Sequence, residues 1–196
     1  MVSRIGIICF GIVFSCALAV PASAYMEIDP LTRKPLYAEQ PAQDYRPQVS
    51  AVPRETVSYD GKYSPDTIII STKERRLYYV LPGGKALRYG VGVGRPGFTW
   101  GGNITVTQKR EWPDWRPPKA MLKRRPDLPR HMKGGIDNPL GARALYLGST
   151  IYRIHGSNEP ETIGEAVSSG CIRMTNEDVI DLYNRARVGT RVIVQR

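Results

Sequence analysis

The sequence contains few of the residues that disulfides, metal sites and membrane spans require. Its 196 residues include three cysteines and two histidines, and neither a Cys-x-x-Cys nor a His-Glu-x-x-His pattern occurs among them. The apolar stretch over residues 5–20 is shorter than the roughly 20 residues that a membrane-spanning helix needs. These absences argue against an integral membrane protein, a disulfide-stabilised fold and a structural zinc site.

The composition is that of one folded domain with a basic surface. Hydrophobic residues make up 41% and charged residues 23% of the chain, which leaves enough apolar side chains for a core. With 19 glycines and 16 prolines, we expect strands and loops to dominate over helices. Lysine and arginine outnumber acidic residues by 28 to 18, so the formal net charge is +10 and anionic surroundings are favoured.

Residues 1–24 have the pattern of a secretory signal peptide. Arg4 provides a basic start, the apolar stretch 5–20 follows, and residues 21–24 (Pro-Ala-Ser-Ala) form a small-x-small cleavage pattern. We therefore expect export to the periplasm with cleavage after Ala24. An uncleaved membrane anchor is the alternative interpretation of the same stretch.

Export changes what the cysteines can do. Cys9 and Cys16 would leave with the signal peptide, so Cys171 would be the single thiol of the mature chain. A single cysteine forms no internal disulfide, and an unpaired thiol is a liability in an oxidising compartment. A chemical role would explain why Cys171 is present. Export also argues against a nucleic-acid partner, despite the basic charge.

The remaining chain divides into two regions by composition. Residues 25–64 carry five prolines without a sustained hydrophobic period, which is typical of a linker or extended arm. In residues 65–196, short β-branched runs alternate with turn residues, as in a mainly β sandwich or barrel. The expected strands cover residues 67–71, 76–80, 86–93, 104–107, 145–147, 151–154 and 191–194.

One helix is expected near the C-terminus. Thr175 is a suitable N-cap, Asp178 follows three residues later as in a capping box, and the apolar residues between 179 and 186 recur on one face. Gly189 is placed to end this helix.

Residues 112–139 form a long segment without strong periodicity. They hold six prolines, two tryptophans and a cluster of basic residues, which predicts a functional flap. We expect a short helix over residues 119–124 within it. The basic and aromatic side chains could contact anionic groups or cover a cleft, or they could form a solvated charge cluster.

Two sequence patterns could indicate a cofactor or metal site, but the residues around them argue against both. Residues 92–97 match G-x-G-x-x-G, but Pro96 lies inside the motif and no βαβ unit surrounds it, so we expect a turn rather than a dinucleotide site. His131, His155 and Cys171 could be three zinc ligands, but their spacings are too wide for a known structural pattern. We therefore expect neither a cofactor nor a metal.

The combination of His155 with residues 168–174 (Ser-Ser-Gly-Cys-Ile-Arg-Met) indicates nucleophilic catalysis. A thiolate is a strong nucleophile, an imidazole can accept its proton, and an ion pair of the two lowers the pKa of the thiol. Gly170 lets the backbone approach a carbonyl, so that amides of the turn can stabilise an oxyanion. Arg173 can hold a substrate carboxylate. The alternative is a buried core cysteine with a structural histidine.

These residues resemble the signature of the L,D-transpeptidase family, whose catalytic unit is the YkuD domain. Residues 138–145 also resemble the segment that this family carries before its histidine strand. The resemblance covers about residues 65–196 and implies a mainly β, YkuD-type β-sandwich with a short C-terminal helix and a flap loop. It leaves residues 25–64 unexplained.

The resemblance also implies a role for each residue of the motif. Cys171 would be the nucleophile and His155 the base. The Gly170 and Cys171 amides, in the turn that includes Ser169, would form the oxyanion site. The expected substrate-binding residues are Arg173, Gly156 and Ser168.

The implied reaction is that of a cysteine acyltransferase acting on peptidoglycan stem peptides. The enzyme would attack the meso-diaminopimelate carbonyl of a tetrapeptide stem, release D-alanine and transfer the acyl group to an amine. The product would be a 3→3 crosslink or a protein, such as an outer-membrane protein, anchored to the wall. No metal, nucleotide or nucleic acid would take part.

Two features leave alternatives open. Ser169 stands where many family members have histidine, and Thr99-Trp100-Gly101-Gly102 replaces the usual Thr-Pro-x-Gly, so that Trp100 could reshape the cleft or serve in packing. Water could also resolve the acyl-enzyme, which would make the protein an L,D-carboxypeptidase or endopeptidase. A non-catalytic wall-binding module is a third possibility.

Overall fold

The computed structural model describes residue 48 and residues 50–196. All of these belong to one compact unit. The expected signal peptide and most of the expected arm lie outside the described residues. Among the described residues, no helix is long and apolar enough to cross a membrane.

The structure is built mainly from strands, as the sequence predicts. Nine of them form one sheet in the order β1-β4-β3-β2-β11-β6-β7-β8-β10, and β5 and β9 form a separate parallel pair. The strand bounds are β1 Glu55–Ser58, β2 Ile68–Ser71, β3 Arg76–Leu81, β4 Lys85–Gly90, β5 Val93–Gly94, β6 Gly102–Glu111, β7 Arg143–Leu147, β8 Arg153–His155, β9 Ala166–Ser168, β10 Ile172–Arg173 and β11 Arg191–Gln195.

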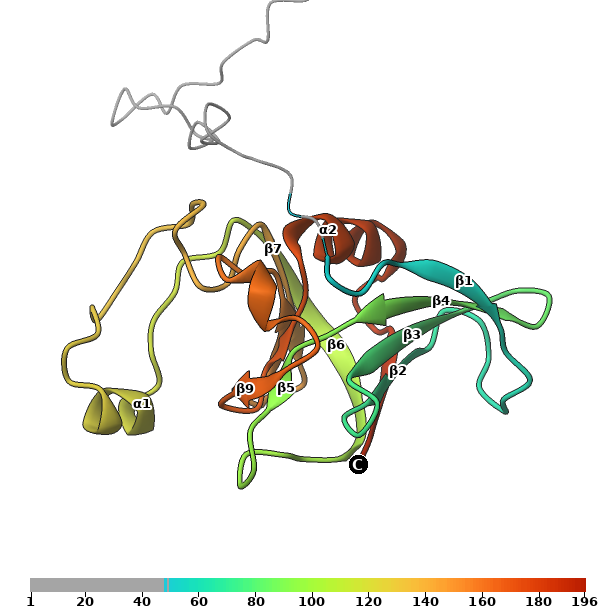
Figure 1. Cartoon of the computed structure of the whole chain (residues 1–196), viewed down its shortest axis with the longest axis horizontal. Helices are drawn as coiled ribbons and strands as arrows, with labels where there is room; N and C mark the ends of the chain where they lie inside the picture. Colours follow the sequence, from blue (N-terminus) through green and yellow to red (C-terminus); the bar gives the residue numbers. More distant parts are fainter. Residues whose placement is uncertain (1–47, 49) are drawn as a thin grey trace, which may run out of the picture. The chain divides into compact units, whose positions relative to one another are not determined.

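The long strand β6 connects the two halves of the large sheet (Figure 1). Its first residues pair with β11, as Ile104 does with Val192, and its later residues pair with β7, as Lys109 does with Leu145. The register shifts between Val106 and the next paired residue, which marks a bulge. Bulges bend a strand and increase its twist, so the sheet curls here and places β7, β8 and β10 beyond the bend.

The core lies inside this curled sheet and under one helix. Val179 and Leu182 of α2 (Asn176–Arg185) are fully buried, and α2 packs against β7 and β8. The buried apolar side chains of the sheet include Ile68, Ile70, Leu77, Tyr89, Val106, Leu145, Leu147, Ile154, Ile172 and Val192. The expectation of a mainly β fold with a short C-terminal helix is confirmed.

Helix α2 begins as expected and ends earlier than expected. The Thr175 hydroxyl accepts a hydrogen bond from the Asp178 N–H at 3.2 Å, which confirms the N-cap. The helix ends at Arg185 rather than close to Gly189. The Lys109 ammonium donates to the carbonyls of Tyr183 and Ala186 at 2.6 and 2.7 Å, so a side chain from β6 satisfies the last turn.

Part of the proline-containing segment 25–64 joins the sheet. Residues 55–58 form β1, which pairs antiparallel with β4. Glu55 forms an ion pair with Arg88 of β4. This short strand forms because it pairs with β4, and the local composition of residues 55–58 does not predict that pairing.

Residues 112–142 connect β6 to β7 and contain the expected short helix. This helix, α1 (Lys119–Arg124), stands apart from the large sheet in Figure 1. Trp115 and Met132 exchange backbone hydrogen bonds, which closes the base of the loop. A 3-10 turn, η1 (Pro160–Thr162), lies between β8 and β9.

Candidate active site

His155 is the last residue of β8, the strand between β7 and β10. Its Nδ1 lies 2.6 Å from the carbonyl oxygen of Gly156. A carbonyl oxygen only accepts hydrogen bonds, so Nδ1 carries a proton, and in the neutral ring Nε2 is the basic nitrogen. Gly156 therefore orients the imidazole through its main chain.

The surroundings of His155 favour the neutral ring. The side chain is buried, and burial lowers its pKa strongly from the usual 6.5, to about 3. The nearby charges of Arg173 and Arg153 lower the pKa further, while the hydrogen bond to Gly156 acts in the opposite direction. At neutral pH, His155 is thus a proton acceptor rather than a cation.

Cys171 lies in the turn between β9 and β10. Its neighbour Ile172 pairs with Ile154 of β8, which brings the turn beside the histidine strand. The thiol donates to the carbonyl of Ile151 at 3.7 Å. Burial raises the pKa of the Cys171 thiol, although Arg153 and Arg173 oppose this effect. These directions favour a neutral thiol–imidazole pair at rest, in place of the ion pair expected from sequence.

Ser168 holds the turn around Cys171 together. Its hydroxyl donates to the Cys171 carbonyl at 2.6 Å and accepts from the Gly170 N–H at 3.0 Å. The Gly170 amide, expected to be an oxyanion donor, is therefore already engaged. The Cys171 N–H makes no hydrogen bond to any described residue, which leaves it available to an oxyanion.

Gly170 allows aromatic side chains to pack under this turn. Its φ of +109° is unfavourable for other residues, and a Cβ here would meet a ring carbon of Tyr152 at 2.6 Å. Trp100 stacks on Tyr152 with ring centroids 4.5 Å apart and donates its Nε1–H to the Gly170 carbonyl at 2.7 Å. The tryptophan that departs from the usual family pattern thus supports the cysteine turn.

Arg173 is held in place by its neighbours on two sides. Its main chain exchanges hydrogen bonds with Gly92, and its guanidinium contacts Glu159 at 2.7 Å.

Two glycines of the G-x-G-x-x-G pattern lie close to other backbone segments. A Cβ on Gly94 would lie 2.5 Å from the Phe98 carbonyl oxygen. Gly92 and Gly94 of the G-x-G-x-x-G pattern therefore allow close backbone packing beside the site, whereas Gly97 has a φ of +83° and no atom within 4 Å of a Cβ position.

The remaining predicted residues have structural contacts. Ser169 accepts a long hydrogen bond from Arg95 at 3.4 Å. A Cβ on Gly156 would meet Asn176 Oδ1 at 2.2 Å, so only glycine fits there. His131 lies on the flap, 2.9 Å from Asp114, rather than with the other two candidate zinc ligands. No cluster of three or more metal-binding side chains occurs in the described part of the chain.

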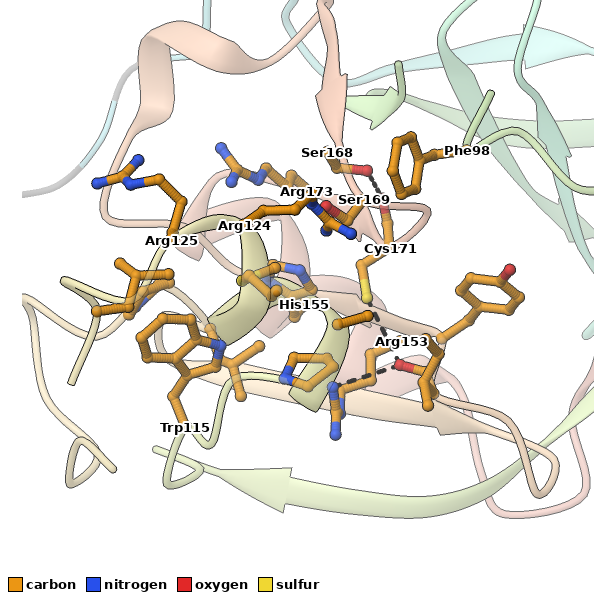
Figure 2. Close-up of a pocket in the computed structure, with 18 of the residues that line it drawn as sticks. Phe98, Trp115, Arg124, Arg125, Arg153, His155, Ser168, Ser169, Cys171 and Arg173 are labelled. Carbon is orange, nitrogen blue, oxygen red and sulfur yellow. Dashed lines mark hydrogen bonds between the residues drawn. The ribbon is translucent and has the colours of Figure 1, made fainter. Parts of the chain in front are cut away.

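Cys171 and His155 open into one cavity of about 490 Å³ (Figure 2). Arginine side chains from the flap and from the strands line this cavity. Glu159 is the one acidic side chain among its lining residues. The four arginines are Arg124, Arg125, Arg153 and Arg173. The cavity is therefore suited to a substrate with several carboxylates.

Sequence reasoning missed several residues that line this cavity. Ile151, Arg153 and His155 alternate along one stretch of chain, and alternation places side chains on the same face of a strand. This period could have pointed to Arg153. Phe98 and Glu159 reach the cavity through loops, for which the sequence offers no comparable signal.

Comparison with known proteins gives consistent results. The family model of the L,D-transpeptidase catalytic domain, YkuD, matches residues 65–194. The probable L,D-transpeptidase ErfK/SrfK of Escherichia coli K12 is 39% identical over 139 residues, which are 65% of this chain and 44% of that protein. The chain spans about half the length of the curated relatives it matches.

Solved structures show the same fold. The catalytic domain of the E. faecium L,D-transpeptidase acylated by ertapenem is 20% identical with a TM-score of 0.52, over 68% of this chain and 100% of that one. A Brucella melitensis protein named a probable carnitine operon oxidoreductase is 46% identical with a TM-score of 0.50, over 73% and 93% of the two chains. With the family model matched across residues 65–194, the chain belongs to the YkuD family of L,D-transpeptidase catalytic domains.

Proposed function

We propose that this protein is a periplasmic L,D-transpeptidase that carries an acyl group on Cys171. The observation that supports it most directly is that Cys171 and His155 line the same arginine-rich cavity. The substrate would be a peptidoglycan tetrapeptide stem, attacked at the meso-diaminopimelate carbonyl. Export by the signal peptide 1–24 and a linker formed by the part of residues 25–64 that precedes β1 belong to the same proposal.

The first half-reaction uses Cys171 as the nucleophile and His155 as the base. His155 takes the thiol proton on Nε2, and the Cys171 sulfur bonds to the substrate carbonyl carbon. The negative charge that develops on the carbonyl oxygen is met by the Cys171 N–H. When the carbon–nitrogen bond breaks, His155 returns the proton to the departing D-alanine amine, and a thioester remains.

The second half-reaction uses an amine from another molecule. His155, again neutral, removes a proton as the amine attacks the thioester, and the thiol is regenerated with that proton. An acceptor diaminopimelate would give a 3→3 crosslink, and a protein amine would give anchoring to the wall. The flap that brings α1 to the cavity would limit the access of water.

Three of the four cavity arginines would hold the stem. Arg124 is the last residue of α1, Arg125 follows it, and Arg173 lies on β10 next to the cysteine. A stem peptide carries several carboxylates, which guanidinium groups bind in a bidentate manner. Ser168 and Gly156, predicted to bind substrate, would act instead by shaping the turn and the histidine.

The test is acylation by a carbapenem, followed by intact-protein mass spectrometry. We expect a stoichiometric adduct on the mature protein and none on Cys171→Ala. A general base usually accelerates a reaction by about 10²–10⁴-fold, so His155→Ala should form the adduct at least 100-fold more slowly. His131→Ala is the matched control, since that histidine lies on the flap with Asp114, and it should react like the wild type. A folded wild-type protein that forms no adduct would contradict the proposal.

A second assay distinguishes transfer from hydrolysis. Tetrapeptide stems are incubated with the enzyme, with and without an acceptor amine, and the products are separated by mass. We expect a crosslinked product that depends on the acceptor. Tripeptide alone, formed equally in both reactions, would identify a carboxypeptidase, and binding to isolated wall without any product would identify a binding module.

A further inference from the structure

Arg153 is a charged residue of the active-site strand to which the mechanism so far assigns no role. It precedes His155 by two residues in β8, so both side chains lie on the same face of the strand. Both line the cavity that contains Cys171, and Figure 2 shows Arg153 on the side toward which the cysteine sulfur points.

Arg153 and the thiol share one acceptor. The carbonyl of Ile151 accepts from the Cys171 thiol at 3.7 Å and from the Arg153 guanidinium at 3.4 Å. When the thiol loses its proton it can no longer donate, and its contact with this carbonyl becomes unfavourable. The Arg153 guanidinium, already at the same oxygen, can donate to the new thiolate together with the Arg153 main-chain N–H.

The contacts of Arg153 leave its guanidinium able to donate a hydrogen bond to the thiolate. Its Nε is buried without a hydrogen-bond partner, and no carboxylate among the described residues pairs with it. Its guanidinium lies 5.0 Å from the centroid of the Tyr146 ring, which supports the side chain from one side. Arg173, the other arginine beside Cys171, is engaged by Glu159.

We propose that Arg153 is a third catalytic side chain, whose guanidinium stabilises the Cys171 thiolate while His155 holds the proton. This rests on the proposed role of Cys171 as the nucleophile. The proton moves from sulfur to His155 Nε2, and the negative charge remains on sulfur beside Arg153 until the sulfur–carbon bond forms. The charge then moves to the carbonyl oxygen, and Arg153 returns to the Ile151 carbonyl.

The other charged groups around the thiol do not replace Arg153. Burial raises the pKa of Cys171, and the main chain and side chain of Arg153 oppose this effect ahead of Arg173. Several titratable and charged groups face the cavity. They are His155 and Arg153 on β8, Tyr152 before it, Arg173 on β10, Arg124 and Arg125 on the flap, Glu159 before η1, and Arg95, which contacts Ser169.

The experiment measures the thiol directly and needs no peptidoglycan. The rate of Cys171 alkylation by iodoacetamide is followed across pH by intact mass, for the wild type, Arg153→Gln and Arg153→Lys. We expect the apparent pKa of the thiol to rise by about one unit or more in the Gln variant, as an opposite charge within a few ångströms requires. Lys should restore most of the shift. Arg191→Gln, an exposed arginine on β11, should match the wild type.

An alkylation profile of Arg153→Gln that superimposes on the wild type would overturn the proposal. Circular dichroism shows whether each variant is folded, and Arg153→Met, which keeps the packing on Tyr146 and removes the charge, substitutes for a Gln variant that does not fold. A shifted profile in a protein that never reacts with stem peptides would contradict the proposed function and support the role of Arg153.

Discussion

The indole N–H of Trp100 donates a 2.7 Å hydrogen bond to the carbonyl of Gly170, the residue immediately before Cys171. The same indole stacks on Tyr152 with the two rings 6° from parallel. Tyr152 in turn fills the space that a Cβ on Gly170 would occupy. One aromatic pair therefore fixes both the direction of the Gly170 carbonyl and the left-handed backbone that orients the Cys171 N–H.

Replacing Trp100 by Phe should slow acylation of Cys171 without unfolding the protein. The phenyl ring can keep the stack on Tyr152 but cannot donate to the Gly170 carbonyl. A hydrogen bond of this kind contributes about 1 kcal/mol, so we expect a decrease of about fivefold in the acylation rate constant. The measurement is the time course of the carbapenem adduct by intact mass.

Tyr152→Phe is the matched control for this change. It keeps both the stack and the Trp100 hydrogen bond, and its acylation rate should equal that of the wild type. An unchanged rate in Trp100→Phe would show that Trp100 serves only in packing.

Ser168→Ala should lower both stability and reactivity. The hydroxyl of this buried serine is the partner of the Gly170 N–H and of the Cys171 carbonyl, and both would lose a hydrogen bond. An unsatisfied buried group costs about 1–3 kcal/mol. We expect a decrease of that size in the free energy of unfolding, measured by urea denaturation, together with slower acylation.

The control for Ser168 is Ser149→Ala, because Ser149 is exposed in the turn after β7. Its unfolding curve should superimpose on the wild type. If Ser168→Ala loses stability and still acylates at the wild-type rate, the hydroxyl stabilises the fold without shaping the catalytic turn.

Most of the fold was predictable because its strands carry local signals. The β-branched run of β2 and the turn at residues 82–84 lie where the sequence predicts them. β1 was not predictable, since its place depends on pairing with β4 rather than on its own composition. The early end of α2 has the same origin, because Lys109 from β6 satisfies its last carbonyls.

The site was predictable where it is local in sequence. His155 and the turn that holds Cys171 could be named from residue types and spacing. The support of that turn by Trp100 and the shared acceptor at Ile151 depend on contacts between distant segments. The neutral state of the thiol–imidazole pair depends on burial, which a sequence pattern does not reveal.

Replacing Phe98 by Leu should loosen the flap. The Phe98 ring contacts two cations, with the guanidinium of Arg95 at 4.2 Å and that of Arg124 of α1 at 5.2 Å from its centroid. A cation–π contact of this kind contributes about 0.5–1 kcal/mol, so loss of the aromatic ring should raise the population of the open flap about two- to fivefold. The measurement is the rate of limited trypsin cleavage within residues 116–133.

The control for the flap is Arg125→Gln. Arg125 pairs with Asp127 inside the same segment and makes no cation–π contact with Phe98. Its cleavage rate should stay at the wild-type value. Equal cleavage of the wild type and Phe98→Leu would show that the ring does not hold α1 over the cavity.

Acid should destabilise the protein through His155. The unfolded imidazole binds a proton near pH 6.5, while burial lowers the folded pKa to about 3. Between these values the unfolded state holds more protons, so the free energy of unfolding falls by about 1.4 kcal/mol for each pH unit as the pH decreases. Above pH 6.5 both states are neutral and this contribution to the pH dependence disappears.

Urea denaturation at pH 7, 6 and 5 tests this for the wild type and His155→Gln. Other titrating groups contribute alike to both proteins, so the difference in slope isolates His155. We expect the wild type to lose stability as the pH falls, and His155→Gln to lose about 2 kcal/mol less between pH 6.5 and pH 5. Equal losses in the wild type and His155→Gln would mean that folding does not lower the pKa of His155. A smaller loss in the wild type than in His155→Gln would mean that folding raises this pKa, as an ion pair with the thiolate requires.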